Sequence, residues 1–255
     1  MKILKFVVSF LLFLGVLFLL VWAGIKSNDQ RCNQISILIN SSNEFKLLTE
    51  SDILHVLKQN NMECEGKTIK EVELASIHKI LAKENYIKTV DKVHFLSSKL
   101  QIEVTLYNIL LEIQLKNGEK FLLDENGTYL PYSPKVGSGV IIAQGTFQSN
   151  YKKKETISMN DYELSELLSL ASHIHADPFY SELFCKLDIN EKQEITLYPS
   201  VGQLPVLFGT TLDATKKLKS LRYMYKEVLP YMNEDKYARL DVRFKNRIIA
   251  TKSKA

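Results

Sequence analysis

An uninterrupted apolar segment close to the N-terminus constrains this chain more than any other feature of its sequence. Residues 6–23 read FVVSFLLFLGVLFLLVWA, and Ser9 is the only polar side chain among them. A helix of this length can cross the hydrocarbon core of a bilayer. We therefore expect a transmembrane helix over residues 6–25, preceded by a cytoplasmic tail of residues 1–5.

A cleaved signal peptide is the alternative to a retained anchor. Its apolar region is usually shorter and ends in an A-x-A-like cleavage site, whereas this segment ends with the bulky Trp22. A lipoprotein needs its cysteine directly after the apolar run, and Cys32 comes later. We favour retention. Because Lys2 and Lys5 flank the N-terminal side, the positive-inside tendency places the N-terminus in the cytoplasm and residues 26–255 outside it.

The charge balance argues against a nucleic-acid-binding protein. Lys and Arg number 33 and Asp and Glu number 29, and Lys2 and Lys5 account for part of this excess. The part that follows the apolar segment is therefore nearly neutral and lacks the basic footprint of a nucleic-acid-binding domain. The only basic cluster, residues 152–154, is typical of a solvated loop.

The three cysteines, Cys32, Cys64 and Cys185, are widely spaced and form no C-x-x-C pair. They predict neither a dense disulfide framework nor a zinc site. A single bridge is left open, including one between Cys64 and Cys185. We favour the interpretation that all three are unpaired small core residues.

After a polar linker of residues 26–33, the pattern predicts a small domain of order β-α-α-β-β over residues 34–107. Apolar side chains alternate over residues 34–40, and Thr49 and Asp52 form a T-x-x-D cap ahead of a short helix. A second helix and two alternating strands follow. Their defining residues are Leu74, Ile77, Ile80 and Leu81 in the helix, Val93 and Phe95 in the first strand, and Leu100, Ile102, Val104 and Leu106 in the second.

The remaining residues, 108–252, predict a larger mixed β-sheet domain with flanking helices, and residues 253–255 form a tail. The fold class is therefore α+β. Two Asn-Gly dipeptides suited to tight hairpin turns separate the first strands, helical patterns interrupt the later ones, and a hairpin ends the domain. The dipeptides are Asn117-Gly118 and Asn126-Gly127, the helical patterns cover residues 164–171 and 212–229, and the final strands cover residues 240–244 and 247–251.

Three segments carry a resemblance to one protein family. They read LQIEVTLYNILLEIQLKNGEKFLLDENGTYLP from Leu100, LPVLFG from Leu204 and LDVRFKNRIIATK from Leu240. Together with the apolar segment and the β-α-α-β-β unit, they resemble the bacterial cell-division protein FtsQ, called DivIB in some groups. The resemblance covers nearly the whole chain, and Leu122, Asp124 and Gly127 sit where the family's hairpin pattern asks for them.

The resemblance implies a POTRA domain and a β domain in a single-pass protein of the cell inner membrane, with its bulk in the periplasm at the division septum. It implies a non-enzymatic scaffold without a cofactor that binds the single-pass proteins FtsB and FtsL and regulates septal wall synthesis. Other divisome proteins are expected to bind the POTRA domain. The alternatives are a POTRA-containing component of polypeptide transport or outer-membrane assembly, and a membrane-tethered hydrolase.

The final strand is the candidate partner-binding site. It has one neighbour in the hairpin and little chain after it to cover its other edge, so we expect a partner to add a strand there. In the family, the corresponding strand receives a strand from FtsB, and Phe244 matches an aromatic position, although Lys252 stands where relatives often have an aromatic residue. The predicted binding residues are Arg243, Phe244, Arg247, Ile248, Ile249, Ala250 and Thr251.

One spacing invites a metal-binding interpretation. His173, His175 and Asp177 could share an ion on an extended strand, but here they end a helical pattern and Pro178 follows them. We therefore interpret them as a polar helix end. The sequence contains no G-x-S-x-G, P-loop, G-x-G-x-x-G or H-E-x-x-H motif, and we expect no catalytic, cofactor-binding or metal-binding residues.

Overall fold

The computed structural model describes residues 13–18, 30–137, 139–145, 153–157, 161–202, 204–232, 236–245 and 247–253. The chain divides into two compact units, unit 1 of Met1–Asn40 with Leu48–Leu106 and unit 2 of Ser41–Leu47 with Tyr107–Ala255. Residues 13–18 are helical, and the rest of the transmembrane helix predicted over residues 6–25 lies outside the described residues. None of the helices within the described ranges has the length and apolar character that crossing a membrane requires.

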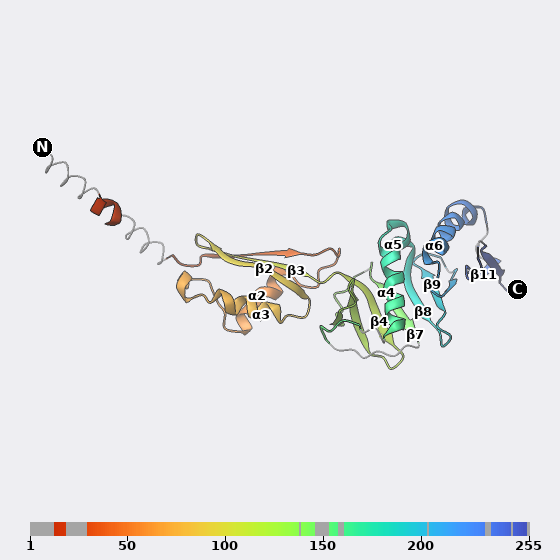
Figure 1. Cartoon of the computed structure of the whole chain (residues 1–255), viewed down its shortest axis with the longest axis horizontal. Helices are drawn as coiled ribbons and strands as arrows, with labels where there is room; N and C mark the ends of the chain where they lie inside the picture. Colours follow the sequence, from red (N-terminus) through yellow and green to blue (C-terminus); the bar gives the residue numbers. More distant parts are fainter. Residues whose placement is uncertain are drawn as a thin grey trace. The chain divides into compact units, whose positions relative to one another are not determined.

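Unit 1 has the β-α-α-β-β order that the sequence predicts, with one 3₁₀ turn added. Its elements are β1 (Gln34–Asn40), α2 (Glu50–Gln59), η1 (Ile69–Glu71), α3 (Leu74–Ala82), β2 (Ile87–Leu96) and β3 (Lys99–Leu106). The strands form a sheet in the order β1-β3-β2, with β1 parallel and β2 antiparallel to β3. Figure 1 shows α2 and α3 on one face of this sheet.

Local sequence chemistry explains these elements. Thr49 and Asp52 form the predicted capping box of α2, because the Asp52 N–H donates to Thr49 Oγ1 at 3.3 Å and the Thr49 N–H donates to Asp52 Oδ2 at 2.8 Å. Alternate residues of β3, including Leu100, Ile102 and Val104, are buried. Strand periodicity therefore gives this sheet one core-facing side.

Unit 2 is built on a nine-stranded sheet in the order β12-β11-β10-β9-β8-β7-β4-β5-β6. The strands β4, β5 and β6 form the antiparallel meander that the Asn-Gly turns predict, but β7 returns to the other side of β4 and pairs parallel to it. The strands are β4 (Ile109–Leu115), β5 (Lys120–Asp124), β6 (Tyr129–Pro131), β7 (Ile141–Gly145), β8 (Phe184–Ile189), β9 (Ile195–Pro199), β10 (Val206–Gly209), β11 (Tyr237–Asp241) and β12 (Ile249–Lys252).

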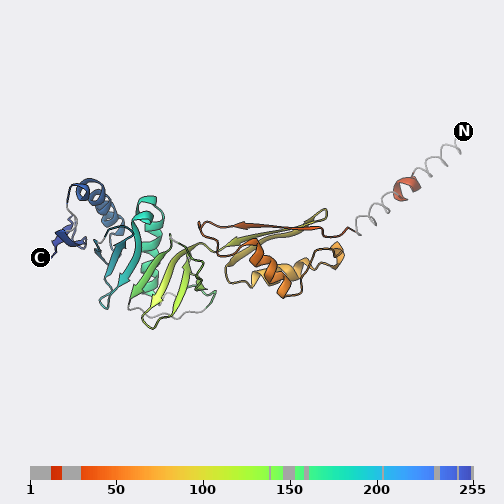
Figure 2. The same ribbon diagram turned by 180° about the vertical axis from the view of Figure 1, so that it is seen from behind.

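Helices cover one face of this sheet. Figures 1 and 2 show α4 (Tyr162–His175) lying across it, and apolar residues of α4 such as Leu164, Leu167 and Ile174 join the core cluster of unit 2. The chain continues from α4 into the short α5 (Pro178–Leu183), which the sequence analysis missed.

Several sequence predictions for unit 2 differ from the structure. The final strands predicted over residues 240–244 and 247–251 are β11 (Tyr237–Asp241) and β12 (Ile249–Lys252). The single helix predicted over residues 212–229 is α6 (Ala214–Tyr223), continued by a π-helical turn η2 (Met224–Val228) and a 3₁₀ turn η3 (Leu229–Tyr231). Cys185 is exposed, so the prediction that all three cysteines are core residues is wrong for this one.

Candidate partner-binding edge

The strand β12 lies at one end of the nine-stranded sheet. It pairs antiparallel with β11, and β11 pairs parallel with β10 through two matched positions, Val206 with Leu240 and Leu207 with Asp241. Among the described strands, β11 is the only neighbour of β12. The other side of β12 therefore presents backbone groups that a further strand could use.

One hydrogen bond identifies which backbone groups point outward. The Ser253 N–H donates to the Lys236 C=O at 2.8 Å, and these two residues flank the pair of Tyr237 and Lys252. In an antiparallel ladder, flanking hydrogen bonds of this kind mark a non-hydrogen-bonded pair, whose own N–H and C=O groups point away from the partner strand. The backbone N–H and C=O of Lys252 therefore face away from β11.

The alternation of a regular strand extends this assignment along β12. The irregularity in the pairing adds a residue to β11, between Tyr237 and Arg239, whereas consecutive residues of β12 remain matched. The N–H and C=O groups of Ala250 consequently point outward, like those of Lys252, and those of Ile249 and Thr251 point toward β11.

The side chains of this region divide between the core and the solvent. Ile248 and Ala250 are partly buried against the core cluster, whereas the Ile249 residue is 42% exposed. The sequence predicts that the final strand begins at Arg247, but β12 begins two residues later, at Ile249. Arg247 belongs to the preceding turn, where its N–H donates to the Phe244 C=O at 3.4 Å.

Arg243 links the end of β11 to the turn before β9. Its Nε and Nη2 donate to the two carboxylate oxygens of Asp241 at 3.0 and 2.7 Å, and its Nη1 donates to Glu194 Oε1 at 2.8 Å. Burial raises the pKa of Asp241, but the hydrogen bonds from Arg243 outweigh it and the net shift is downward. The Arg243 hydrogen bond likewise lowers the pKa of Glu194. Both acids are therefore held in their charged forms.

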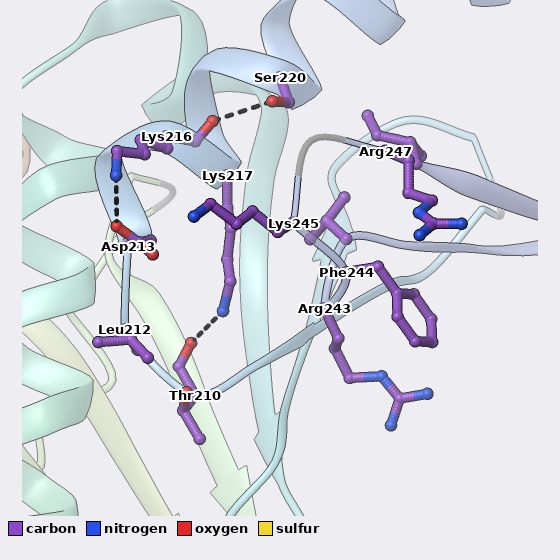
Figure 3. Close-up of a pocket in the computed structure, with 12 residues that line it drawn as sticks. Thr210, Leu212, Asp213, Lys216, Lys217, Ser220, Arg243, Phe244, Lys245 and Arg247 are labelled. Carbon is purple, nitrogen blue, oxygen red and sulfur yellow. Dashed lines mark hydrogen bonds and ion pairs between the residues drawn. The ribbon is translucent and has the colours of Figure 1, made fainter.

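A groove of about 310 Å³ lies beside this edge, between α6 and the turn that joins β11 to β12 (Figure 3). It is lined by Thr210, Leu212, Asp213, Lys216, Lys217, Ser220, Val242, Arg243, Phe244, Lys245, Arg247 and Ile248. Basic residues outnumber acidic ones in this lining, and apolar side chains lie among them.

Two of the lysines are already engaged within the fold. Lys216 forms an ion pair with Asp213 at 2.9 Å. Lys217 donates to the carbonyl oxygens of Phe208 and Thr210 at 3.1 and 2.7 Å, and desolvation lowers its pKa. These two side chains therefore shape the loop before α6 and contribute little free charge to the groove.

The remaining positive charge comes from Lys245 and Arg247. Neither side chain forms an ion pair with an acid in the described part of the chain. Figure 3 shows Lys245 extending toward the start of α6, with Phe244 and Arg247 on the other side of the turn. Because Leu212 is 75% and Phe244 47% exposed, the groove combines cationic and apolar contact surface.

The histidines and the acid that the sequence singled out do not form a metal site in this structure. His173 and His175 lie in the last turn of α4, and His173 Nδ1 is 2.8 Å from the Ser169 carbonyl oxygen. Asp177 caps α5 and forms an ion pair with Arg222. In the described ranges, no three potential metal ligands gather in one place.

Comparison with known protein families finds two matches. Residues 110–251, more than half of the chain, match the family described as FtsQ/DivIB, C-terminal related. Residues 30–105 match the POTRA-like domain. No curated protein matches the chain. The chain therefore belongs to the FtsQ/DivIB family.

Proposed function

We propose that this chain is a membrane-anchored scaffold of the bacterial cell-division machinery, which holds partner proteins outside the cytoplasm and regulates septal wall synthesis through them. The FtsQ/DivIB family match and the POTRA-like domain support the role in cell division. The chain acts by binding and performs no reaction of its own. Other divisome proteins bind to unit 1 in this proposal.

The outward backbone of β12 is the observation that carries this proposal. Ala250 and Lys252 direct N–H and C=O groups away from β11, so an extended segment can continue the ladder. The exposed side chain of Ile249 offers apolar contact beside those groups. We propose that a single-pass division protein of the FtsB or FtsL type supplies the added strand.

The groove next to β12 suggests the chemistry of the partner. Lys245 and Arg247 favour carboxylates in the residues that adjoin the added strand, because opposite charges attract across an interface. Leu212 and Phe244 favour an apolar side chain in the same segment. The proposed ligand is therefore an extended segment flanked by acidic and apolar residues.

A pair of proline variants tests the added strand. Ala250→Pro removes an outward N–H, whereas Ile249→Pro removes an N–H that faces β11, so only the second should disrupt the hairpin itself. We expect Ala250→Pro to weaken partner binding by at least about 30-fold, as loss of a central contact does, while the melting temperature changes by a few degrees. The measurements are titration of the partner's outer segment and thermal unfolding.

Ala250→Ser is the matched control, because it retains the backbone N–H and changes the side chain little. It should bind the partner almost as well as the wild type does. Retention of full affinity by a folded Ala250→Pro variant would exclude strand addition at β12.

The orientation in the membrane has its own test. The support for it is the position of Lys2 and Lys5 before the apolar segment. A reporter that is active only after export, fused after Ala255, is expected to be active in intact cells. Activity of a reporter that works only in the cytoplasm would contradict the proposed topology.

A further inference from the structure

Unit 1 contains two buried thiols that the proposed function does not use. The Cys32 residue has 0% and the Cys64 residue 2% of its surface exposed. Cys32 precedes β1, and Cys64 lies between α2 and η1. Both cysteines thus belong to connecting segments, where burial to this degree is unusual and calls for a physical reason.

Backbone hydrogen bonds hold the two segments together. The Cys32 N–H donates to the Lys67 C=O at 2.9 Å, and the Gly66 N–H donates to the Cys32 C=O at 2.8 Å. The Lys67 N–H in turn donates to the Cys64 C=O at 3.2 Å, which closes a tight turn with Gly66 at φ +79°. Cys32 therefore lies directly beside the turn that Cys64 begins.

The electrostatic surroundings of Cys64 also indicate that the two cysteines lie close together. Burial raises the pKa of Cys64, and the neighbouring Cys32 raises it further. The sulfurs make weak contacts, Cys32 Sγ at 3.7 Å from the Gln34 carbonyl oxygen and Cys64 Sγ at 3.3 Å from that of Met62. In the part of the chain that the structure describes, no third ligand completes a metal site with them.

We propose that Cys32 and Cys64 form a disulfide bond when the chain folds in an oxidising environment. The oxidant is a disulfide such as oxidised glutathione. One cysteine thiolate attacks it, forms a mixed disulfide and releases one thiol. The second cysteine then attacks the mixed disulfide and releases the other thiol, so that the two electrons and two protons of the cysteines end on the two thiols of the oxidant.

The bond closes a loop over residues 33–63, which contains β1 and α2. It ties the segment before β1 to the loop after α2, and stabilises unit 1 mainly by restricting its unfolded chain. Because the reaction needs an accessible thiolate, we expect it during folding and not on the closed unit. Cys185 belongs to unit 2 and is exposed, and it takes no part in the bond.

The test uses the full-length chain in detergent, unfolded and then refolded either with reduced and oxidised glutathione or with a strong reductant. Peptide mapping without reduction should find Cys32 linked to Cys64, with Cys185 open to alkylation. Unit 1 of the oxidised protein should melt on the order of 10 °C above that of the reduced protein. The control Cys185→Ser should keep both the link and the difference in melting, whereas Cys32→Ser and Cys64→Ser should each remove both.

Two results would overturn the proposal. One is a glutathione-refolded wild-type chain in which Cys32 and Cys64 are both alkylated after denaturation. The other is a link from either cysteine to Cys185. Neither readout depends on partner binding, so this inference and the proposed function stand or fall separately.

Discussion

The two ends of the nine-stranded sheet differ in whether another segment of the chain covers the edge strand. At β6, the Tyr129 N–H donates to the Glu155 C=O at 2.8 Å and the Lys154 N–H donates to the Tyr129 C=O at 2.7 Å, so a segment of residues 153–157 covers the edge. At β12, no strand among the described residues lies beyond the edge. If a partner adds a strand to this sheet, the cover at β6 leaves β12 as the edge strand open to it.

The two ends also differ in the number of paired positions that join each end to the rest of the sheet. The strands β4 and β5 are matched at five positions, whereas β11 and β10 are matched at two. Arg243 reinforces the second junction through its bonds to Asp241 and Glu194. A hairpin that depends on so few backbone bonds and one charged cluster should be the first part of unit 2 to open.

The largest effect is expected at the covered end, from Gly127→Ala. Gly127 has φ +78°, and a Cβ there would lie 2.6 Å from Ile157 Cγ1 in the covering segment. The left-handed backbone costs about 1–2 kcal/mol for any other residue, and the collision adds about 1–3 kcal/mol. We therefore expect the free energy of unfolding of unit 2 to fall by about 3 kcal/mol, measured by denaturant titration.

Gly118→Ala is the matched control for that variant. Gly118 also follows an asparagine and has φ +90°, but apart from its own chain neighbours no described atom lies within 4 Å of its added Cβ. It should lose only the backbone contribution of about 1–2 kcal/mol. Equal losses at the two glycines would show that the covering segment contributes nothing to the stability of β6.

A smaller loss is expected at the open end from Arg243→Gln. The variant removes both guanidinium hydrogen bonds to the buried Asp241 and leaves it the backbone N–H of residue 243, and a loss of this kind costs about 2 kcal/mol. Hydrogen exchange should increase in β11 and β12 before it increases elsewhere in unit 2. Arg239→Gln makes the same change at an exposed position of β11 and should cost less than about 0.5 kcal/mol.

Acid should also loosen the open end, by less than that substitution does. The pKa values of Asp241 and Glu194 are lowered in the folded protein, so their contribution is present above the unfolded-state values of about 4 and is lost as the pH falls through the folded values. The stability difference between the wild type and Arg243→Gln should therefore shrink between pH 6 and pH 3. A constant difference over this range would mean that neither carboxylate is coupled to Arg243.

Local patterns predict those parts of the fold that depend on neighbours in sequence. The alternation of Leu100, Ile102 and Val104 predicts β3, and the Thr49 cap predicts the start of α2. The two Asn-Gly turns predict the meander of β4, β5 and β6. In each case the determining interaction spans only a few residues.

Contacts between distant segments escape such patterns. Ile109, the first residue of β4, forms two hydrogen bonds with the side chain of Asn43, at 2.9 and 3.0 Å. The sequence around either residue contains no pattern that predicts this contact. The segment that covers β6, residues 153–157, is largely polar, and its sequence pattern predicts only a loop. The sequence also gives no means of deciding that Ala250 points outward, because that depends on an extra residue in β11. Register, unlike periodicity, is a property of two strands together.

The smallest effect is expected from Lys245→Gln, which tests whether the groove extends the open edge. Lys245 is exposed, and its charge acts on Asp213 without forming a close ion pair with it, so the loss of Lys245 should leave the melting temperature nearly unchanged. If an acidic partner segment occupies the groove, affinity should fall by about 3-fold to 10-fold, and its dependence on salt should weaken, because one screened attraction is removed.

The matched control is Lys192→Gln. Lys192 is an exposed lysine in the turn between β8 and β9 and lies outside the groove lining, so this variant should change affinity less than about 2-fold. Equal affinities for the two variants at low salt would confine the partner to the backbone of β12, whereas a loss that persists at high salt would point to a direct hydrogen bond from Lys245.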